Sequence, residues 1–313
     1  MNIKEHDLTD KTAIQIKSEK TPSRLTGDSG FLRFGLIGIM LVLFSIFVFL
    51  PLGVLFYEAL QKGISAYFKA ISDPLTLDAI KLTLMAAGVA IPLNLVFGIT
   101  SAWAITKFDF RGKDFLITLI DIPFSISPVI SGLIFILLFG RNGWFGQWLA
   151  THDIQVIFAV PGIILASVFV TFPFISRELI PLMQSQGSDE EEAAISLGAS
   201  GWTTFFKITL PNIKWGLLYG ILLCNARAMG EFGAVSIVSG HIRGLTNTLP
   251  LHVEILYNDY NFQAAFAVAS LLTFLSVFTI IAQNLVGYFQ KKYGVQHGGI
   301  SHSPSKKSSG EKI

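Results

Sequence analysis

Six long stretches of the chain carry almost no Lys, Arg, Asp or Glu, and they alternate with segments where the charged residues gather. The stretches run from Phe34 to Tyr57, Leu82 to Thr106, Phe115 to Gly140, Ile154 to Ser176, Trp215 to Gly240 and Tyr260 to Gln290. Each is longer than the roughly 20 residues with which a helix crosses about 30 Å of hydrocarbon. The pattern predicts an all-α membrane protein with six transmembrane helices, in which tilt or shorter helix ends absorb the excess length.

The composition strengthens this prediction. Hydrophobic residues make up 51% of the 313 residues and charged residues 14%, and the mean hydropathy is +0.58. These values lie outside the range of soluble globular proteins. A large soluble helical bundle is the alternative, but buried helices of that kind rarely run so long without a polar face. The first stretch is too long for a signal-peptide core and has no A-x-A-like cleavage site, so we expect it to be retained as a span.

Lys and Arg are divided unevenly between the two predicted sides of the membrane. With the amino terminus inside, the outside segments hold only Lys62, Lys69, Lys81, Arg141 and Arg243. The positive-inside rule therefore predicts that both termini are cytoplasmic. The net charge of +2 then reflects topology, and the absence of a basic patch interleaved with aromatic residues excludes a nucleic-acid binder.

The same reading divides the chain into a cytoplasmic amino-terminal tail at 1–30, a transmembrane domain at 31–290 and a cytoplasmic tail at 291–313. The end of the chain from Gly298 onward is rich in Ser, Gly and Lys and has almost no apolar residue, which predicts disorder. An inside loop at 177–214 keeps a strong helical pattern and is too long to be a passive connector.

The centre of this loop carries the signals of two short helices. Ser188 followed by Glu191 predicts a capping box that begins the first helix. Gly198 is placed to end that helix in a left-handed conformation, Ser200 to cap a second helix, and Pro211 to close the second helix.

The surface of these two helices predicts a docking element. Small residues at Ala193, Ala194 and Gly198 form one face, and Leu197, Trp202 and Phe205 add apolar area. This arrangement suits insertion into a groove of another protein. An amphipathic helix lying among lipid headgroups is the alternative.

Within the loop, Glu192, Ala193, Ala194, Gly198, Ile208, Leu210 and Pro211 reproduce the EAA-x3-G-x9-I-x-L-P pattern. In this pattern the chain resembles the permeases of binding-protein-dependent ABC importers. The segments LIDIPFSISPVISGL, NARAMGEFGAVSIVSG and IRGLTNTLPLHVEILYNDYN are similar to the sulfate/thiosulfate permeases of that family, from about residue 31 to residue 290. The resemblance implies a type I importer fold in which the loop is a cytoplasmic coupling helix that docks on an ATPase subunit.

The resemblance also implies the partners. It predicts a homologous permease subunit that shares the conduit, two ATP-binding ABC subunits and a periplasmic sulfate/thiosulfate-binding protein, all at a bacterial inner membrane.

Ionisable and hydroxyl side chains within the spans are the candidates for the translocation path. Arg227 and Glu231 lie one helical turn apart inside the fifth stretch, where a charge needs a partner or water. They either line the path of an oxyanion or form a purely structural salt bridge. In the third stretch, Pro123 and Pro128 interrupt the helix, Asp121 is a lone carboxylate, and the further candidates are Ser125, Ser127 and Ser131. The spacing of Ala226, Gly230 and Ala234 predicts close packing of a second helix.

Several kinds of chemistry are missing from the sequence. No G-x-x-x-x-G-K-[ST] pattern is present, so ATP must be hydrolysed by a partner subunit. The histidines, namely His6, His152, His241, His252, His297 and His302, have no ligand spacing and are expected in solvent. With the single cysteine, Cys224, in a span, no catalytic constellation is indicated. We therefore expect no catalytic residue, metal or cofactor.

These observations predict a non-enzymatic permease subunit that imports sulfate or thiosulfate with energy from a separate ATPase. A molybdate or tungstate permease is the nearest alternative, because those tetrahedral dianions make the same demands on a conduit. A secondary transporter coupled to protons or sodium, with Glu231 or Asp121 as the coupling carboxylate, is the alternative of another class. It leaves the loop motif unexplained. A membrane-embedded enzyme or receptor lacks support in the residues.

Overall fold

The structure is a computed structural model that describes residues 30–294, with side chains for residues 34–289. All regular elements in this part of the chain are helical. The chain divides after Val54 into two compact units, 1–54 and 55–313. The predicted tail 1–30 lies outside the described residues apart from Gly30, and of the predicted tail 291–313 only the first four residues are described.

Four helical segments are long and apolar enough to cross a membrane. They are Phe34–Leu60 in α1 (Gly30–Leu60), Pro74–Lys107, which is α3, Val160–Gln186, which joins α7 (Val160–Thr171) to α8 (Pro173–Gln186), and Phe262–Phe289 in α14 (Phe262–Gly294). A fifth candidate is the pair α4 (Lys113–Ser125) and α5 (Pro128–Phe139). The described residues thus contain four or five candidate spans, and the sixth remains a prediction.

The bend between α4 and α5 lies where two prolines interrupt the third apolar stretch. The direction of the helix axis changes by 106° from α4 to α5. Ile126 and Ser127 are extended between them, as expected for residues that precede Pro128. Because Pro128 has no backbone N–H to donate, it is tolerated in the first turn of α5.

The fifth apolar stretch is not one helix. α11 (Leu210–Met229) ends with Gly230 as its C-cap, and α12 (Gly233–Val238) follows after a short break. The expected packing face of Ala226, Gly230 and Ala234 is therefore wrong, because the helix ends between its members. The small residues that do pack are Gly216, Gly220, Cys224 and Ala228, which are buried on α11. Gly216 lies against Leu182, and Gly220 against Ile175 and Glu178.

The helices α3, α8 and α11 form the core at one end of the second unit. Gly98 allows α3 to approach Ile175 of α8 closely. Side-chain hydrogen bonds between the helices accompany this contact. Asn94 of α3 donates to Thr171 Oγ1 at the end of α7 over 2.7 Å, and the hydroxyls of Ser101 in α3 and Ser176 in α8 lie 2.7 Å apart. Small residues and interhelical hydrogen bonds of this kind stabilise helix pairs in lipid, where apolar burial drives association less.

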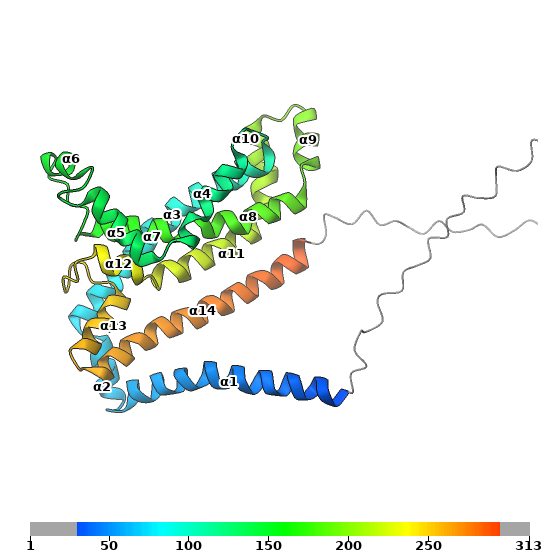
Figure 1. Cartoon of the computed structure of the whole chain (residues 1–313). Coiled ribbons are helices and arrows are strands. Elements are labelled where there is room, and N and C mark those ends of the chain that lie inside the picture. Colours follow the sequence, from blue (N-terminus) through cyan, green and yellow to red (C-terminus); the bar gives the residue numbers. More distant parts are fainter. Residues whose placement is uncertain (1–29, 295–313) are drawn as a thin grey trace, which may run out of the picture. The chain divides into compact units, whose positions relative to one another are not determined.

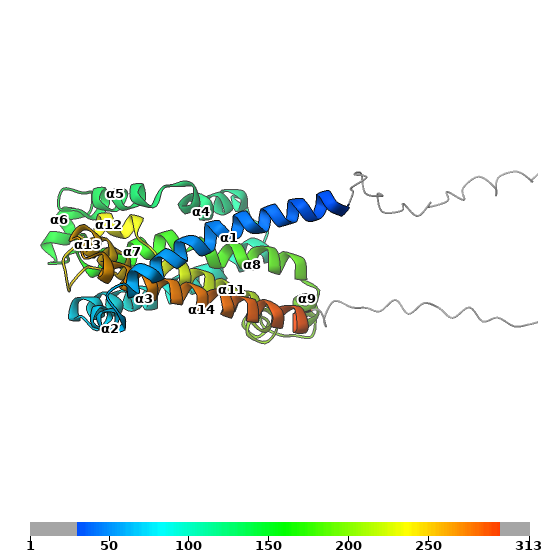
Figure 2. The same cartoon turned by 90° about the horizontal axis from the view of Figure 1, so that it is seen from below.

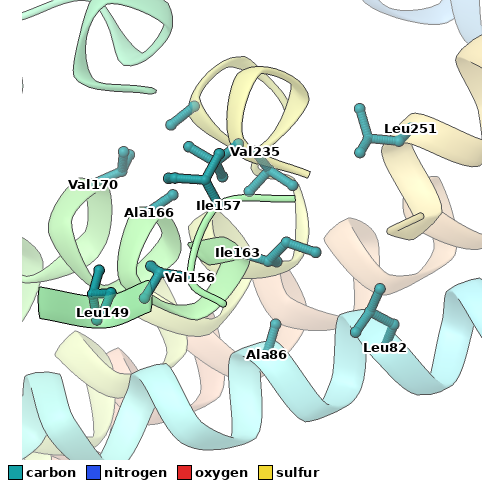
Figure 3. Close-up of a cluster of buried hydrophobic side chains, with 12 residues drawn as sticks. Leu82, Ala86, Leu149, Val156, Ile157, Ile163, Ala166, Val170, Val235 and Leu251 are labelled. Carbon is teal, nitrogen blue, oxygen red and sulfur yellow. The ribbon is translucent and has the colours of Figure 1, made fainter. Parts of the chain in front are cut away.

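A second cluster of buried side chains lies at the other end of the same unit (Figure 3). It joins α3 and α7 to three short helices: α6 (Gly146–Thr151), α12 and α13 (Leu249–Asn258). The short helix α2 (Ile64–Ile71) lies at this end as well, and α9 (Asp189–Ser196) and α10 (Gly201–Thr204) lie at the opposite end (Figures 1 and 2). The predicted coupling segment is thus separated from α2, α6, α12 and α13 by the length of the long helices.

The close contact at Gly98 yields a prediction about stability. A Cβ added there would lie 2.5 Å from Ile175 Cγ2 and 2.6 Å from Ile175 Cβ. We expect Gly98→Ala to destabilise the protein by about 1–3 kcal/mol through overpacking. Gly88→Ala on the same helix is the matched control. A Cβ at Gly88 meets nothing within 4 Å, so the higher helix propensity of Ala makes this variant neutral or more stable. Thermal unfolding of the purified protein in detergent measures both; equal effects would contradict the packing account.

Candidate functional site

The first helix of the motif segment begins where the sequence predicts, but by different contacts. α9 starts directly after Ser188. The Ser188 side chain makes no cap bond to the backbone and instead donates to Glu192 Oε1 over 2.6 Å. Glu191 turns away and forms an ion pair with Lys107 Nζ at 3.0 Å. The predicted capping box between Ser188 and Glu191 is therefore wrong, because the lysine competes for the carboxylate.

Gly198 ends α9 in the predicted way. Its φ is +88°, in the left-handed region that residues with a side chain rarely adopt. The N–H of Gly198 donates to the Ile195 carbonyl, and the N–H of Ala199 to the Ala194 carbonyl. This confirms the prediction that Gly198 closes the first helix and turns the chain.

The second helix also begins as predicted, but it does not end at Pro211. Ser200 Oγ accepts a hydrogen bond from the Thr203 N–H at 3.3 Å and caps α10. The chain then passes through a π-helical segment, η1 (Phe205–Thr209), directly into α11. Pro211 lies in the first turn of α11 and cannot donate to the carbonyl four residues earlier. The wider π turn is a way in which a helix can accommodate this missing hydrogen bond without ending.

The bend between α9 and α10 presents apolar side chains to the exterior. Leu197 is 90% exposed and Trp202 71%, and Trp202 stacks on the exposed ring of Phe206. Phe205, predicted to belong to this face, is buried against Trp103 of α3 instead. The motif residues surround this surface. Glu192, Ala193, Gly198 and Pro211 are exposed, and Ala194, Ile208 and Leu210 are half-buried.

Arg227 and Glu231 form a close ion pair although α11 ends between them. Arg227 Nη1 lies 2.5 Å from Glu231 Oε2. The Glu231 side chain is 1% exposed and that of Arg227 34%. The other carboxylate oxygen of Glu231 accepts the Ala234 N–H at 2.9 Å, in the first turn of α12. Glu231 thus neutralises Arg227 and also caps α12, whose unpaired N–H groups favour an anion.

The hydroxyl candidates lie on both sides of the α4–α5 bend. Ser125 and Ser127 are exposed, and Ser131 is buried with its hydroxyl directed to the Ser127 carbonyl. α5 packs closely on α12, because Gly132 lies against Ile237 and Gly233 lies against Pro128. This contact brings the amino end of α5 next to the start of α12, close in sequence to Glu231.

Asp121 is not a lone carboxylate, as the sequence suggested. Its Oδ1 lies 2.8 Å from Arg177 Nε, and the Arg177 guanidinium lies 4.4 Å from the centre of the Phe124 ring. Arg177, expected at the start of the inside loop, lies within α8 and inside a candidate span. Asp121 thus neutralises a charge that lies inside the continuous helix α8.

The histidines of the described residues differ in their surroundings. His152 and His241 are exposed, as expected, and His241 Nε2 lies 3.4 Å from Glu254 Oε2. The expectation of solvent exposure is wrong for His252, which is buried with Nε2 3.1 Å from Thr76 Oγ1. Burial lowers the pKa of His252, so its ring stays neutral near pH 7. No group of three or more potential metal ligands occurs among the residues with described side chains.

Comparison with known proteins gives a consistent result. Residues 94–295 match the family described as "Binding-protein-dependent transport system inner membrane component". The "Sulfate transport system permease protein CysW" of Escherichia coli (strain K12) is 50% identical over 251 residues, 80% of this chain and 86% of that protein. "Sulfate permease 2, chloroplastic" of Chlamydomonas reinhardtii is 51% identical over 245 residues, 78% and 66% of the two chains. "Sulfate transport system permease protein CysT" of Escherichia coli (strain K12) is 34% identical over 258 residues, 82% and 92%.

A solved structure supports the fold. The chain superposes with a TM-score of 0.69 and 17% identity on a chain of a bacterial alginate ABC transporter, covering 85% of this chain and 96% of that one. The resemblance drawn from the loop motif and the flanking segments is thereby confirmed at the level of the family. This chain belongs to the family of inner-membrane components of binding-protein-dependent transport systems, as a multi-pass permease.

Proposed function

We propose that this chain is a permease subunit of an ATP-driven importer of sulfate and thiosulfate. The observation that carries the proposal is the identity of 44 to 51% with proteins named as sulfate permeases, over 78 to 87% of the chain. The exposed element at α9 and α10 adds the means of coupling to a separate ATPase.

The assembly contains this chain, a homologous CysT-type permease, two ATPase subunits and a periplasmic sulfate/thiosulfate-binding protein. The CysT relative supports the homologous partner, and the family description supports the binding protein. Burial of the exposed Leu197 and Trp202 side chains in a cleft of an ATPase subunit is more favourable than their exposure to water. The motif residues Glu192 to Pro211 line this docking surface.

The proposed topology has six spans with both termini in the cytoplasm. The span beyond the candidates named above is the fifth in chain order and consists of α11 and α12. Its break at Gly230 is exposed in the single chain, so in this topology it faces the conduit or a partner subunit and not lipid. This orientation places α9 and α10 in the cytoplasm, together with Lys107, Lys113 and Lys207.

The conduit lies between the two permeases and includes Arg227, Glu231, Ser125, Ser127 and Ser131. Arg227 is one-third exposed in the single chain, and a charge in this position must face water or a partner subunit and not lipid. Its guanidinium attracts a passing dianion, while the Glu231 carboxylate prevents binding so tight that the anion cannot leave. ATP binding drives the coupling element between two positions, and the spans alternate between inward-facing and outward-facing states.

Uptake into proteoliposomes tests the class and the substrate. Vesicles that contain the four-subunit complex, with binding protein outside and ATP inside, are expected to accumulate radiolabelled sulfate. Thiosulfate competes, and molybdate barely does. Uptake without internal ATP would contradict the importer class, and preference for molybdate would establish the alternative substrate.

Variants of the ion pair test the proposed path. Arg227→Met alone leaves a buried carboxylate without its cation, which costs about 3 kcal/mol or more. The double variant Arg227→Met/Glu231→Gln removes both charges and keeps an oxygen for the Ala234 N–H. We expect the double variant to recover most of the lost thermal stability and to transport sulfate several-fold more slowly than the unaltered complex. Unchanged transport by a stable double variant would limit the pair to a structural role.

The turn at Gly198 tests the docking element. Gly198→Arg forces a side chain into a left-handed conformation and places it beside Leu197 on the docking surface. We expect normal membrane insertion with loss of ATPase copurification and of uptake. Gly63→Arg is the matched control and should leave copurification unchanged, since Gly63 also has a positive φ, +89°, and a Cβ that would meet nothing within 4 Å, but precedes α2 at the opposite end of the second unit. Full copurification with Gly198→Arg would refute the docking role.

A further inference from the structure

A shielded ion pair joins the coupling element to the last residue of α3. Lys107 Nζ lies 3.0 Å from Glu191 Oε1, and the two side chains are only 12% and 16% exposed. The same ammonium group donates to the carbonyl of Gly187, which lies between α8 and α9. One lysine therefore holds both the first turn of α9 and the connection that leads into it.

Two further contacts tie the same turn of α9 to the start of α11. Glu191 Oε1 also accepts the buried hydroxyl of Thr209 over 3.1 Å. The neighbouring Glu190 accepts Asn212 Nδ2 at 2.5 Å. Glu191 is thus the point at which the cytoplasmic ends of α3 and α11 and the first turn of α9 meet.

Favourable interaction with the helix dipole does not explain this arrangement. Any carboxylate in the first turn of α9 serves the dipole, and Asp189, Glu190 and Glu192 lie in that turn as well. The specific feature of Glu191 is its contact with side chains of two other helices. A charge-assisted contact shielded from water is stronger and less sensitive to salt than one at the surface.

The connections at both ends of α9 are otherwise permissive. Gly187 and Gly198 have φ values of +72° and +88°, and a Cβ at either would meet nothing within 4 Å. Glycines in open space offer little resistance to rotation of the segment between them. Without Lys107 and Glu191, α9 keeps only the contact of Glu190 with Asn212 beside the two flexible residues at its ends.

We propose that Lys107 and Glu191 are positioning residues that fix α9 to the ends of the spans, so that movement of the docked ATPases is transmitted to α3 and α11. This inference rests on the coupling role proposed above for α9. Neither residue belongs to the loop motif. If α9 swivels, ATP-driven movement is absorbed at the two glycines and the conduit does not follow.

Lys107→Met and Glu191→Gln, studied in the assembled complex, test this role. We expect unchanged ATPase copurification and a fall of about five-fold or more in sulfate taken up per ATP hydrolysed, the range typical of coupling between sites. The double variant is expected to be little worse than either single variant, because each single variant already disrupts the shared ion pair. Lys107→Arg retains a cation and should recover most of the ratio.

Lys113→Met is the matched control. Lys113 lies at the same end of the molecule and pairs at 3.4 Å with Asp109, whose side chain is fully exposed.

Backbone hydrogen exchange over residues 187–197 provides a readout that does not depend on the substrate. It is expected to be several-fold faster in Lys107→Met and Glu191→Gln, and unchanged in Lys113→Met.

The outcomes separate this inference from the proposed function. Unaltered complex that takes up no sulfate would refute the substrate, whereas faster exchange in the two variants would still support the positioning role. Unchanged exchange over residues 187–197 would overturn it, as would an unchanged uptake per ATP in a complex that transports. Loss of ATPase copurification in proportion to uptake would also overturn it, because the pair would then serve assembly alone.

Discussion

In the proposed six-span topology, a charge within hydrocarbon must have a partner, and two ion pairs of the second unit meet this constraint. Glu231 neutralises Arg227 and caps α12, so the ion pair holds together the two pieces of the fifth apolar stretch. Asp121 neutralises Arg177 and fastens α4 to α8. Each arginine remains partly exposed in the single chain, at 34% and 53%. In the proposed assembly these exposed sides face water or another subunit, since lipid does not solvate such groups well.

Outside the spans the constraint is reversed, and apolar groups need cover. Leu197 and Trp202 are exposed at the bend between α9 and α10, whereas Glu191 and Glu190 of the same element contact Lys107 and Asn212. An element that makes polar contacts with its own spans and exposes apolar side chains is suited to transmit the movement of a bound partner to those spans. The contacts of Glu191 and Glu190 limit movement of α9 relative to the spans, and the exposed Leu197 and Trp202 are available to bind a partner.

The helical class and the two short helices α9 and α10 can be predicted from the sequence because both depend on local residue types. Charge-free stretches measure hydrophobicity and not helix continuity, so the break at Gly230 was missed. The sequence places Arg177 in a loop because its partner, Asp121, lies far away along the chain. The pairing of Lys107 with Glu191, which are farther apart still, is hidden for the same reason. Gly216 and Gly220, which lie on the packing face of α11, have the same four-residue spacing as Ala226 and Gly230. Spacing alone therefore does not tell which of the two sets packs against another helix.

If Lys107 and Glu191 fix α9 to the spans, α9 and the end of α3 move as one body when the ATPases bind ATP. Spin labels at the exposed positions Ile195 and Phe108, introduced as cysteines in a Cys224→Ala background, report the distance between the two elements in the assembled complex. We expect one narrow distance distribution that is the same with and without ATP. A distribution that shifts or broadens on ATP binding would contradict it, because α9 would then move independently of the span.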